Sequence, residues 1–381
     1  MIRVAVICPW FFRGDAVGAA AKSSHDALAQ DPRLHVSAIG LRNDYPDLPM
    51  RQADGVADLL LTREFLEADV LIYHYAVYQE YFGALLLGNG HGRQVLRFHN
   101  VTPTRFMPRE TWPIISRSFQ QIPSLDAADE VWADSRENAD ELISRGFRRE
   151  CIRVLPLSVD RPDWTALQDK EADRVELLYV GRFFSSKGVL DLLAAADVAR
   201  QATEVAFRLR LVGNLQFSHP PYVAEIREQI GQRGLGDVVE MVGSVEQPVL
   251  EAIYAQTHIL ATASYHEGFC VPVIEGMRAG CIPVSYAAAN LRYVADGLGR
   301  LAPMGDVAAL GRALAETLSV VPAALAAPDQ AVLRLDRGRM SAEAYSEAAH
   351  AHAAAFSFAH LRRNMTERVL ALAASSAHAV R

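Results

Sequence analysis

The sequence has few cysteines, no basic excess and no long apolar run, and each absence excludes a class of protein. Its four cysteines are far apart and form no C-x-x-C pair, which argues against zinc or disulfide frameworks and fits a reducing compartment. Lys and Arg total 38 against 45 Asp and Glu, a net charge of −7, so a general nucleic-acid binder is disfavoured. No stretch reaches about 18 uninterrupted apolar residues, and the first residues lack the pattern of a secretory signal. The sequence therefore predicts a cytoplasmic protein that does not span a membrane.

The length and composition predict an ordinary globular protein of more than one domain. At roughly 150 residues per domain, 381 residues correspond to two domains, or three, with enough chain for full cores. Half of the residues are apolar and 22% are charged, which excludes disorder over most of the chain.

Short β-branched apolar runs alternate with helical segments along the whole chain, which predicts parallel β-α-β units. Expected strands in the first half lie at 2–8, 34–39, 70–73, 94–98, 130–133 and 154–157. After a charged, linker-like stretch at 160–174 the pattern restarts, with expected strands at 175–180, 207–212, 238–242, 259–263 and 282–284. The Ala-rich stretch 341–381 is expected to be helical. The fold class is therefore α/β, with two open parallel sheets.

The sharpest motif follows the expected strand at 259–263 and contains two acids eight positions apart, Glu267 and Glu275. Gly268 and the residues after it precede a helix, and a helix N-terminus is a natural phosphate site. A carboxylate that accepts two hydrogen bonds suits a vicinal diol such as a ribose. The structural alternative is that Glu267 caps a helix and Glu275 lies on a solvated face; the complete string favours the functional interpretation.

A second motif follows the strand at 175–180, where Gly181 is followed by Arg182, Lys187 and Gly188. Two long cations at this spacing can neutralise a diphosphate without a metal ion. The spacing excludes a Walker loop. Two surface cations in a loop are the plainer explanation of the same residues.

Further polar and glycine residues fall after strands of the first half. His74 follows the run at 70–73, and His99 and Asn100 follow the run at 94–98, positions that face a ligand cleft in open parallel sheets. Gly14 and Gly18 lie after the first strand, where backbone amides can approach a phosphate or an acceptor. Their spacing differs from that of a dinucleotide fingerprint, so a nicotinamide enzyme is disfavoured.

Taken in order, these strings resemble family 4 of the retaining glycosyltransferases, the group 1 glycosyltransferases with the GT-B fold. The resemblance covers residues 2 to about 320 and rests on several stretches in chain order: Ala133–Leu142, Leu155–Asp160, Gly181–Gly188, Val242–Ser244 before a helix ending in Tyr254, and Glu267–Glu275. It implies two Rossmann-like open parallel-sheet domains facing across a cleft. Residues 1–160 would form the acceptor domain, joined by a C-terminal helix at about 345–381, and residues 161–344 the nucleotide-sugar donor domain.

The resemblance also implies roles for individual residues. Arg182 and Lys187 would bind the donor diphosphate, Glu275 the ribose, and Glu267 and His99 would lie beside the transferred sugar. Amides of Gly268, Phe269, Cys270 and Val271 would contact sugar and phosphate, and the turn with Gly243 and Ser244 would hold the base. Gly181 belongs to the diphosphate loop, and Gly14, Gly18, His74 and Asn100 to the acceptor side, although the family's adjacent glycines are absent from the first loop. No metal or other cofactor is implied.

The strings Tyr73–Tyr75 and His99–Pro103 resemble those of a subset that acts in bacterial surface-polysaccharide and lipopolysaccharide assembly, often on mannose. The expected partners are a GDP- or UDP-sugar and a glycan or lipid-diphosphate-linked acceptor. Arg105, Arg109 and Arg117, with Phe106 and Trp112 among them, would face that acceptor or the inner membrane; a solvated loop with two buried aromatics explains them equally well. Alternative functions are a non-catalytic nucleotide-sugar-binding scaffold and a GT-B sugar-nucleotide epimerase or hydrolase.

Overall fold

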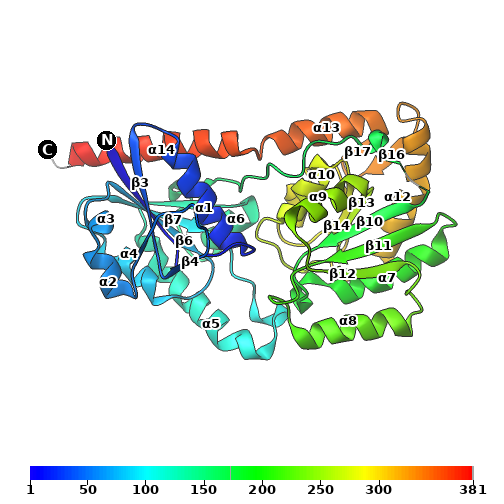
Figure 1. The fold of residues 1–381 in the computed structure, drawn as a ribbon, viewed down its shortest axis with the longest axis horizontal. Coiled ribbons are helices and arrows are strands. Elements are labelled where there is room, and N and C mark those ends of the chain that lie inside the picture. Colours follow the sequence, from blue (N-terminus) through cyan, green and yellow to red (C-terminus); the bar gives the residue numbers. More distant parts are fainter. Residues whose placement is uncertain (172, 380–381) are drawn as a thin grey trace. The chain divides into compact units, whose positions relative to one another are not determined.

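The computed structural model describes residues 1–171 and 173–379, which divide into two compact units, each with its own parallel sheet (Figure 1). The first unit comprises Met1–Thr104, Arg109–Ser158 and Phe356 onward, and the second comprises Arg105–Pro108 and Val159–Ala355. The C-terminal segment therefore rejoins the first unit at Phe356, whereas the sequence placed this point near residue 345.

The first unit contains a seven-stranded sheet in the order β5-β3-β1-β6-β7-β8-β9, with parallel pairs throughout. Its strands are β1 (Ile2–Ile7), β3 (Leu34–Gly40), β5 (Met50–Gln52), β6 (Val70–Tyr75), β7 (Arg93–Phe98), β8 (Glu130–Ala133) and β9 (Ile152–Val154). A short parallel pair joins β2 (Trp10–Phe11) to β4 (Arg42–Asn43). Its helices are α1 (Ala16–Ala29), α2 (Val56–Leu61), α3 (Arg63–Leu66), α4 (Ala84–Leu87), α5 (Trp112–Gln121), α6 (Arg136–Ser144) and α14 (Phe358–Ala379).

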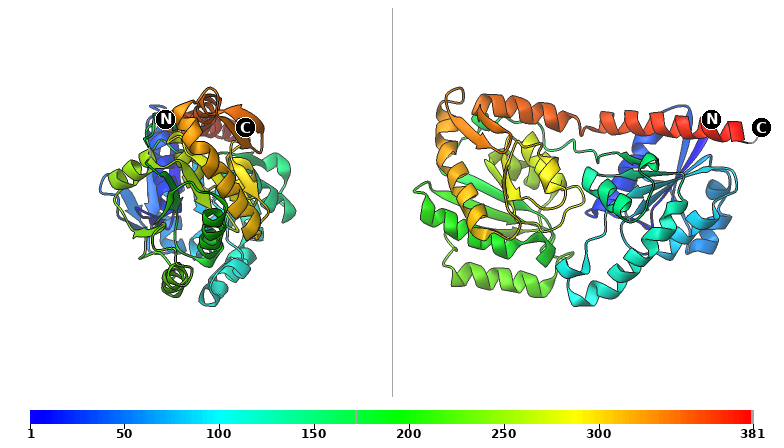
Figure 2. Two further views of the ribbon diagram at one scale, coloured as in Figure 1. Left: turned by 90° about the vertical axis from the view of Figure 1, so that its right-hand side faces the viewer. Right: turned by 180° about the vertical axis from the view of Figure 1, so that it is seen from behind.

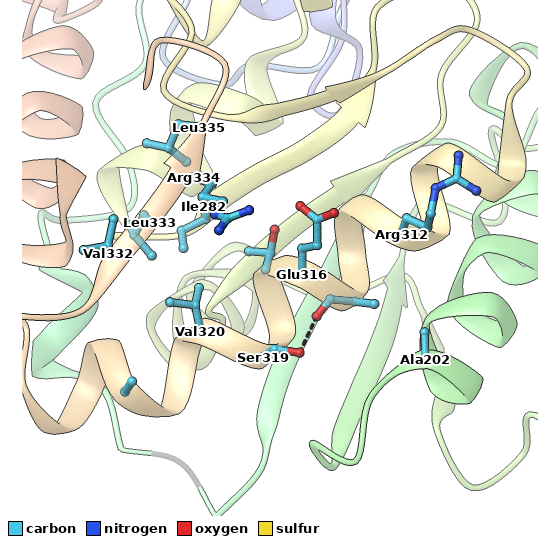
Figure 3. Close-up of a pocket in the computed structure, with 13 residues that line it drawn as sticks. Ala202, Ile282, Arg312, Glu316, Ser319, Val320, Val332, Leu333, Arg334 and Leu335 are labelled. Atoms are coloured by element: carbon cyan, nitrogen blue, oxygen red, sulfur yellow. Dashed lines mark hydrogen bonds between the residues drawn. The ribbon is translucent and has the colours of Figure 1, made fainter. Parts of the chain in front are cut away.

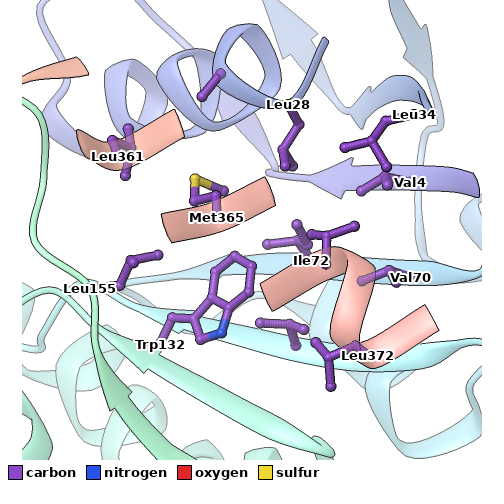
Figure 4. Packing of buried hydrophobic residues seen from close by; sticks show 13 residues of the cluster. Val4, Leu28, Leu34, Val70, Ile72, Trp132, Leu155, Leu361, Met365 and Leu372 are labelled. Atoms are coloured by element: carbon purple, nitrogen blue, oxygen red, sulfur yellow. The ribbon is translucent and has the colours of Figure 1, made fainter. Parts of the chain in front are cut away.

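The C-terminal helix α14 completes the core of the first unit. Figures 1 and 2 show α14, coloured red, beside the blue α1, with which it packs. Figure 4 shows Leu361, Met365 and Leu372 of this helix among buried side chains of the sheet, including Trp132. Arg368 adds a bidentate contact to the buried carboxylate of Glu130. Burial of one apolar stripe of α14 explains why an Ala-rich sequence is ordered here.

The second unit contains a six-stranded parallel sheet in the order β12-β11-β10-β13-β14-β15. The strands are β10 (Val175–Val180), β11 (Phe207–Val212), β12 (Val239–Gly243), β13 (Ile259–Thr262), β14 (Ile282–Tyr286) and β15 (Arg300–Ala302), and a hairpin joins β16 (Val332–Leu335) to β17 (Gly338–Ser341). The helices are α7 (Val189–Ala202), α8 (Pro220–Gln232), α9 (Gln247–Gln256), α10 (Val271–Arg278), α11 (Leu291–Val294), α12 (Val307–Ala326) and α13 (Ala342–Ala354).

Chain direction places the helices of this unit on the two faces of its sheet. Right-handed crossovers put α7 and α8 on one face, since the chain moves from β10 to β12, and α9 and α10 on the other, since it then returns past β10 to β14. Helix α12 packs on α7, and α13 packs on α10 (Figure 1). By length and composition α12 is apolar enough to cross a membrane, but half of its apolar window is buried, as in a core helix.

Most expected strands are confirmed, and three expectations are wrong in detail. The last strand of the first unit is Ile152–Val154 rather than 154–157, because Pro156 has no amide hydrogen for the ladder. The stretch 160–174 is not a free linker, since Lys170 is buried and donates to the carbonyl of Thr257. The C-terminal helix is two helices, because α13 ends before residue 355 and a new helix starts at Phe358.

Candidate functional site

The two predicted motif loops lie next to each other, because they follow the adjacent strands β10 and β13. The chain changes direction across the sheet between these two strands. Open parallel sheets bind ligands at the carboxyl ends of the strands at such a switch point. Gly188 has φ +61° and a Cβ there would lie 2.0 Å from the carbonyl oxygen of Ala263, so only glycine fits this crossing. The amide of Tyr265 also donates to the carbonyl of Ser186 at 2.9 Å. The two loops therefore form one surface.

Lys187 and Glu267, one from each loop, form the central contact of this surface. The Lys187 ammonium donates to both carboxylate oxygens of Glu267, at 2.8 Å each. Glu267 is buried and Lys187 is half-buried, so water screens the pair little. The sequence assigned these residues separately to a diphosphate and to a sugar; the structure brings them together as an ion pair.

The loop after Glu267 ends at the start of α10, with Cys270 in the left-handed region at φ +71° as its N-cap. Phe269 and Cys270 are buried, and burial raises the pKa of the Cys270 thiol, with Glu267 nearby adding to the effect. Asn290, which sequence reasoning missed, holds the loop by donating to the carbonyl of Phe269 at 2.8 Å. The Val271 amide at the start of α10 follows Cys270 in the loop that carries Glu267, where the helix dipole favours an anion. Pro272 has no amide hydrogen, and the amide of Val273 donates to the carbonyl of Cys270 at 3.1 Å.

Glu275 lies within α10 and has a specific partner. The hydroxyl of the buried Tyr254 donates to Oε2 of Glu275 at 2.8 Å. Burial raises the pKa of Glu275 to about 7, and the Tyr254 hydrogen bond opposes that shift. The solvated-face alternative for this acid is therefore wrong. Because the Tyr254 hydroxyl binds Oε2, the other carboxylate oxygen of Glu275 can accept a hydrogen bond from a ligand hydroxyl.

The other residues predicted to bind the donor have contacts of their own, apart from the Lys187–Glu267 pair. Arg182 is exposed, with its guanidinium 5.4 Å from the centre of the Phe184 ring, so the two predicted cations have different neighbours. Gly181 lies against the Tyr179 hydroxyl, which a Cβ would approach to 2.8 Å. In the turn predicted to hold the base, Gly243 has φ +78° and Ser244 Oγ accepts from the amide of Leu215 at 3.1 Å.

In the first unit, His74 and His99 form a buried chain of side chains with Asp134 and Arg97. His74 Nδ1 lies 2.8 Å from His99 Nε2, and His99 Nδ1 lies 2.5 Å from Asp134 Oδ2. Arg97 lies 3.2 Å from the other oxygen of Asp134. Burial holds the pKa of His74 well below its ordinary value, and the positive charge of Arg97 adds to this effect. Sequence reasoning placed both histidines facing a cleft and missed Asp134 and Arg97; an arginine within an apolar strand was the available signal.

The first-loop glycines have mainly structural surroundings. Gly18 lies in α1, where a Cβ would approach the amide nitrogen of Phe12 to 2.6 Å. Its own amide donates to the carboxylate of Asp15, the N-cap of α1, at 2.8 Å. An acid already occupies this helix end, contrary to the prediction that it offers amides to a phosphate. Gly14 has φ +80°, and Asn100, with φ +84°, donates to Asn138 Oδ1 at 2.7 Å.

The basic and aromatic stretch 105–117 is divided between the two units. Phe106 is partly buried against Tyr265 and His266, whereas Trp112 is 40% exposed. Arg117 donates to the hydroxyl of Tyr78 at 2.7 Å and lies over its ring. The alternative with two buried aromatics is therefore wrong for Trp112.

A pocket of about 500 Å³ in the second unit lies away from all these residues. In Figure 3, Arg312, Glu316 and Ser319 project from α12, and Leu333, Arg334 and Leu335 come from β16. Its wall includes Ile282, the first residue of β14, so it lies at the amino end of the strands, opposite the usual ligand edge. Among the described residues, no group of three or more His, Cys, Asp or Glu is placed to hold a metal ion.

The residues predicted to bind the donor lie in a region that is similar to a known protein family. A model of "Glycosyl transferases group 1" matches residues 160–322. The match covers less than half of the chain, and it is a similarity over this region. The matched region contains Arg182, Lys187, Glu267 and Glu275, together with the other predicted donor-binding residues, whereas His74 and His99 lie outside it.

Two curated relatives of this chain are mannosyltransferases. A GDP-mannose:cellobiosyl-diphosphopolyprenol alpha-mannosyltransferase of Xanthomonas campestris is 30% identical over 39% of this chain and 38% of the relative. The O-antigen chain mannosyltransferase B of Escherichia coli is 25% identical over 59% of this chain and 61% of the relative. The chain thus matches about two fifths of the Xanthomonas protein's length.

A solved structure confirms the predicted fold class of two Rossmann-like units. Anabaena Alr3699/HepE in complex with UDP and glucose superposes with a TM-score of 0.71 at 15% identity, over 97% of this chain and 100% of that chain. At this identity the likeness concerns the fold, GT-B, alone.

Proposed function

We propose that the protein is a retaining glycosyltransferase that moves a sugar, mannose in our assignment, from a GDP- or UDP-sugar to a lipid-linked or polysaccharide acceptor. The observation that carries this proposal is the Lys187–Glu267 pair beside the start of α10, with Glu275 and Tyr254 in the same helix layer. A cation, a helix N-terminus and a diol-binding acid in one surface suit a sugar attached to a nucleoside diphosphate. Two mannosyltransferase relatives support the choice of sugar.

The proposed reaction is a front-face substitution. The acceptor hydroxyl attacks the anomeric carbon on the face from which the nucleoside diphosphate leaves, the bond from that carbon to the phosphate oxygen breaks, and a leaving phosphate oxygen takes the hydroxyl proton. Lys187, Arg182 and the first amides of α10 stabilise the charge that develops on the diphosphate. Glu267 orients the sugar and stabilises positive charge on its ring. The resemblance assigns His99 to the sugar, and Glu275 holds the ribose hydroxyls.

The acceptor and location complete the proposal. The protein acts in the cytoplasm, with peripheral contact to the inner membrane through the basic and aromatic stretch at Arg109–Arg117. Trp112 and Ile114, 40% and 37% exposed, with Arg109 and Arg117 flanking them, provide the apolar and cationic groups that such a contact needs.

A thermal-shift screen of GDP- and UDP-sugars, followed by titration of the best ligand, tests the donor assignment. We expect a saturable stabilisation by one nucleotide sugar that the Glu275→Ala variant loses. Turnover of that ligand only in the presence of an acceptor would support transfer. Turnover without acceptor would favour an epimerase or hydrolase, and binding without turnover a scaffold.

Nucleotide binding is expected to tighten as the pH rises through about 7. The carboxyl of Glu275, with its pKa raised to about 7, accepts a hydrogen bond from the ribose best after losing its proton. The raised pKa also affects folding stability. The stability that protonated Glu275 contributes is fully present at a pH below its ordinary pKa and is lost as the pH rises through about 7. Calorimetric titration at about pH 6 and about pH 8 measures the effect. The Glu275→Gln variant should show the same affinity at both values; an equal pH dependence would contradict the assignment.

Transfer is expected to continue in the presence of EDTA. Lys187 and Arg182 supply the positive charge that a divalent ion supplies in other nucleotide-sugar enzymes. Initial rates with and without EDTA measure the dependence. A rate abolished by EDTA and restored by added Mg²⁺ or Mn²⁺ would contradict the metal-independent mechanism.

A further inference from the structure

The tetrapeptide Arg105–Pro108 packs apart from its neighbours in the chain. Thr104 and Arg109 on either side belong to the first unit, whereas these four residues belong to the second. The carbonyl of Phe106 accepts a hydrogen bond from Ser185 Oγ at 2.9 Å. The Phe106 ring stacks on Tyr265 and on His266, with ring centres 5.7 and 6.2 Å apart. We call Arg105–Pro108 the strap.

The strap and the acid loop are anchored to the same short turn. The three-residue turn η7 (Ser185–Lys187) uses each of its residues for a different contact. Ser185 holds the strap through Phe106, the carbonyl of Ser186 accepts from the amide of Tyr265 at 2.9 Å, and Lys187 binds Glu267. The strap and the loop that carries Glu267 are therefore anchored to the same turn.

Tyr265 itself is fixed from the body of the second unit. Its hydroxyl donates to Oδ2 of Asp191 in the first turn of α7, and the hydroxyl of Tyr286 donates to the same oxygen at 2.8 Å. In the chain, His266 lies between Tyr265 and Glu267. The Phe106 ring stacks on the rings of Tyr265 and His266. Arg105, whose guanidinium lies 4.6 Å from the centre of the Phe106 ring, covers the stack.

We propose that Phe106 is a positioning residue for Glu267: the strap packs its ring over Tyr265 and His266 and so fixes the loop that presents this acid. The proposal rests on the proposed function, in which Glu267 acts beside the sugar. The Phe106 ring stacks on Tyr265 and His266, whereas the diphosphate is held by Lys187 and the start of α10. Loss of the ring therefore misplaces the acid more than the nucleotide, and the effect falls on kcat rather than on KM.

The test compares the Phe106→Ala and Phe106→Tyr variants with the wild type, after equal melting temperatures show that both fold. With the nucleotide sugar found by the screen, Phe106→Ala should lower kcat about ten- to a hundredfold and change the donor KM less than about threefold, because small misplacements of reacting groups are costly. Phe106→Tyr keeps the aromatic ring and should restore most of the rate. Ser185→Ala should lower kcat in the same direction by a smaller factor.

The ligand-free protein gives an independent readout. The ring protons of His266, assigned with a His266→Gln variant, should move in the NMR spectrum of Phe106→Ala, because the ring current of Phe106 is lost. Unchanged His266 resonances would overturn the strap contact. If the His266 resonances of Phe106→Ala move but its kcat is unchanged, the positioning role is overturned. The same holds if Phe106→Ala changes only the donor KM. A wild type that transfers no sugar would refute the proposed function, while the His266 resonances would still decide whether the strap is seated.

Discussion

The Lys187→Ala variant is expected to lose about 10²–10³-fold in kcat, which corresponds to about 3 kcal/mol of transition-state stabilisation. In the proposed mechanism, this cation stabilises the charge that develops on the leaving diphosphate. The ligand-free protein already holds the ammonium in place on the buried Glu267, at 2.8 Å from both oxygens. Preorganised charge of this kind costs no rearrangement when the reaction occurs. Steady-state kinetics with the identified donor measure the loss.

Two matched variants separate the roles of the charge. Arg182→Ala removes the exposed cation of the same loop and leaves the Glu267 pair intact, so its loss should be smaller than that of Lys187→Ala. Lys187→Met removes the charge and keeps most of the side-chain length, so its loss in kcat should match that of Lys187→Ala if the charge is what acts. Wild-type rates from Lys187→Ala would contradict the donor-site assignment.

The Asp134→Asn variant is expected to destabilise the first unit by about 3–5 kcal/mol, because it leaves the buried guanidinium of Arg97 without a counter-charge. The carboxylate also accepts from His99, so the histidine pair loses the partner that orients it. Urea unfolding, followed by fluorescence of Trp132 and the other tryptophans, measures the change in midpoint.

An exposed acid in the same region is the control. Asp140→Asn removes a partner of Arg136 at 3.9 Å on the surface of α6, where an ion pair contributes about 0–1 kcal/mol. The double variant Arg97→Met with Asp134→Asn should recover part of the lost stability, since no unpaired charge is then buried. Equal unfolding midpoints for Asp134→Asn and the wild type would refute the buried pair as a determinant of stability.

Sequence patterns predicted helices and strands best where a single local factor, such as burial of a strand on both faces, decides the structure. The apolar runs that became β1, β10 and β13 are recognisable because a parallel strand buried on both faces needs continuous apolar residues. The N-cap of α6 depends on an equally local contact, since Ser135 Oγ accepts from the amide of Asn138. The hairpin β16–β17 escaped prediction, since its strands of four residues are stabilised by α12 and α13.

Side-chain partners were predictable only in part. The sequence indicated Lys187, Glu267 and Glu275 as functional residues because their motifs follow expected strands, and parallel sheets bind ligands at the carboxyl ends of their strands. It did not indicate that Lys187 binds Glu267, that Tyr254 donates to Glu275, or that Asp134 orients His99. These contacts join residues far apart in the chain, and no local spacing encodes them.

The sequence by itself determined the two α/β units, the two charged motifs and the loops that carry them, because hydrophobic periodicity and short motifs are local properties of a chain. Only the tertiary structure decided that Lys187 binds Glu267, that Asp15 caps the helix after the first loop, and that Phe106 packs beside His266. The physical reason is that burial and pairing depend on which distant side chains meet, and this is set by the packing of the whole unit rather than by any segment of it.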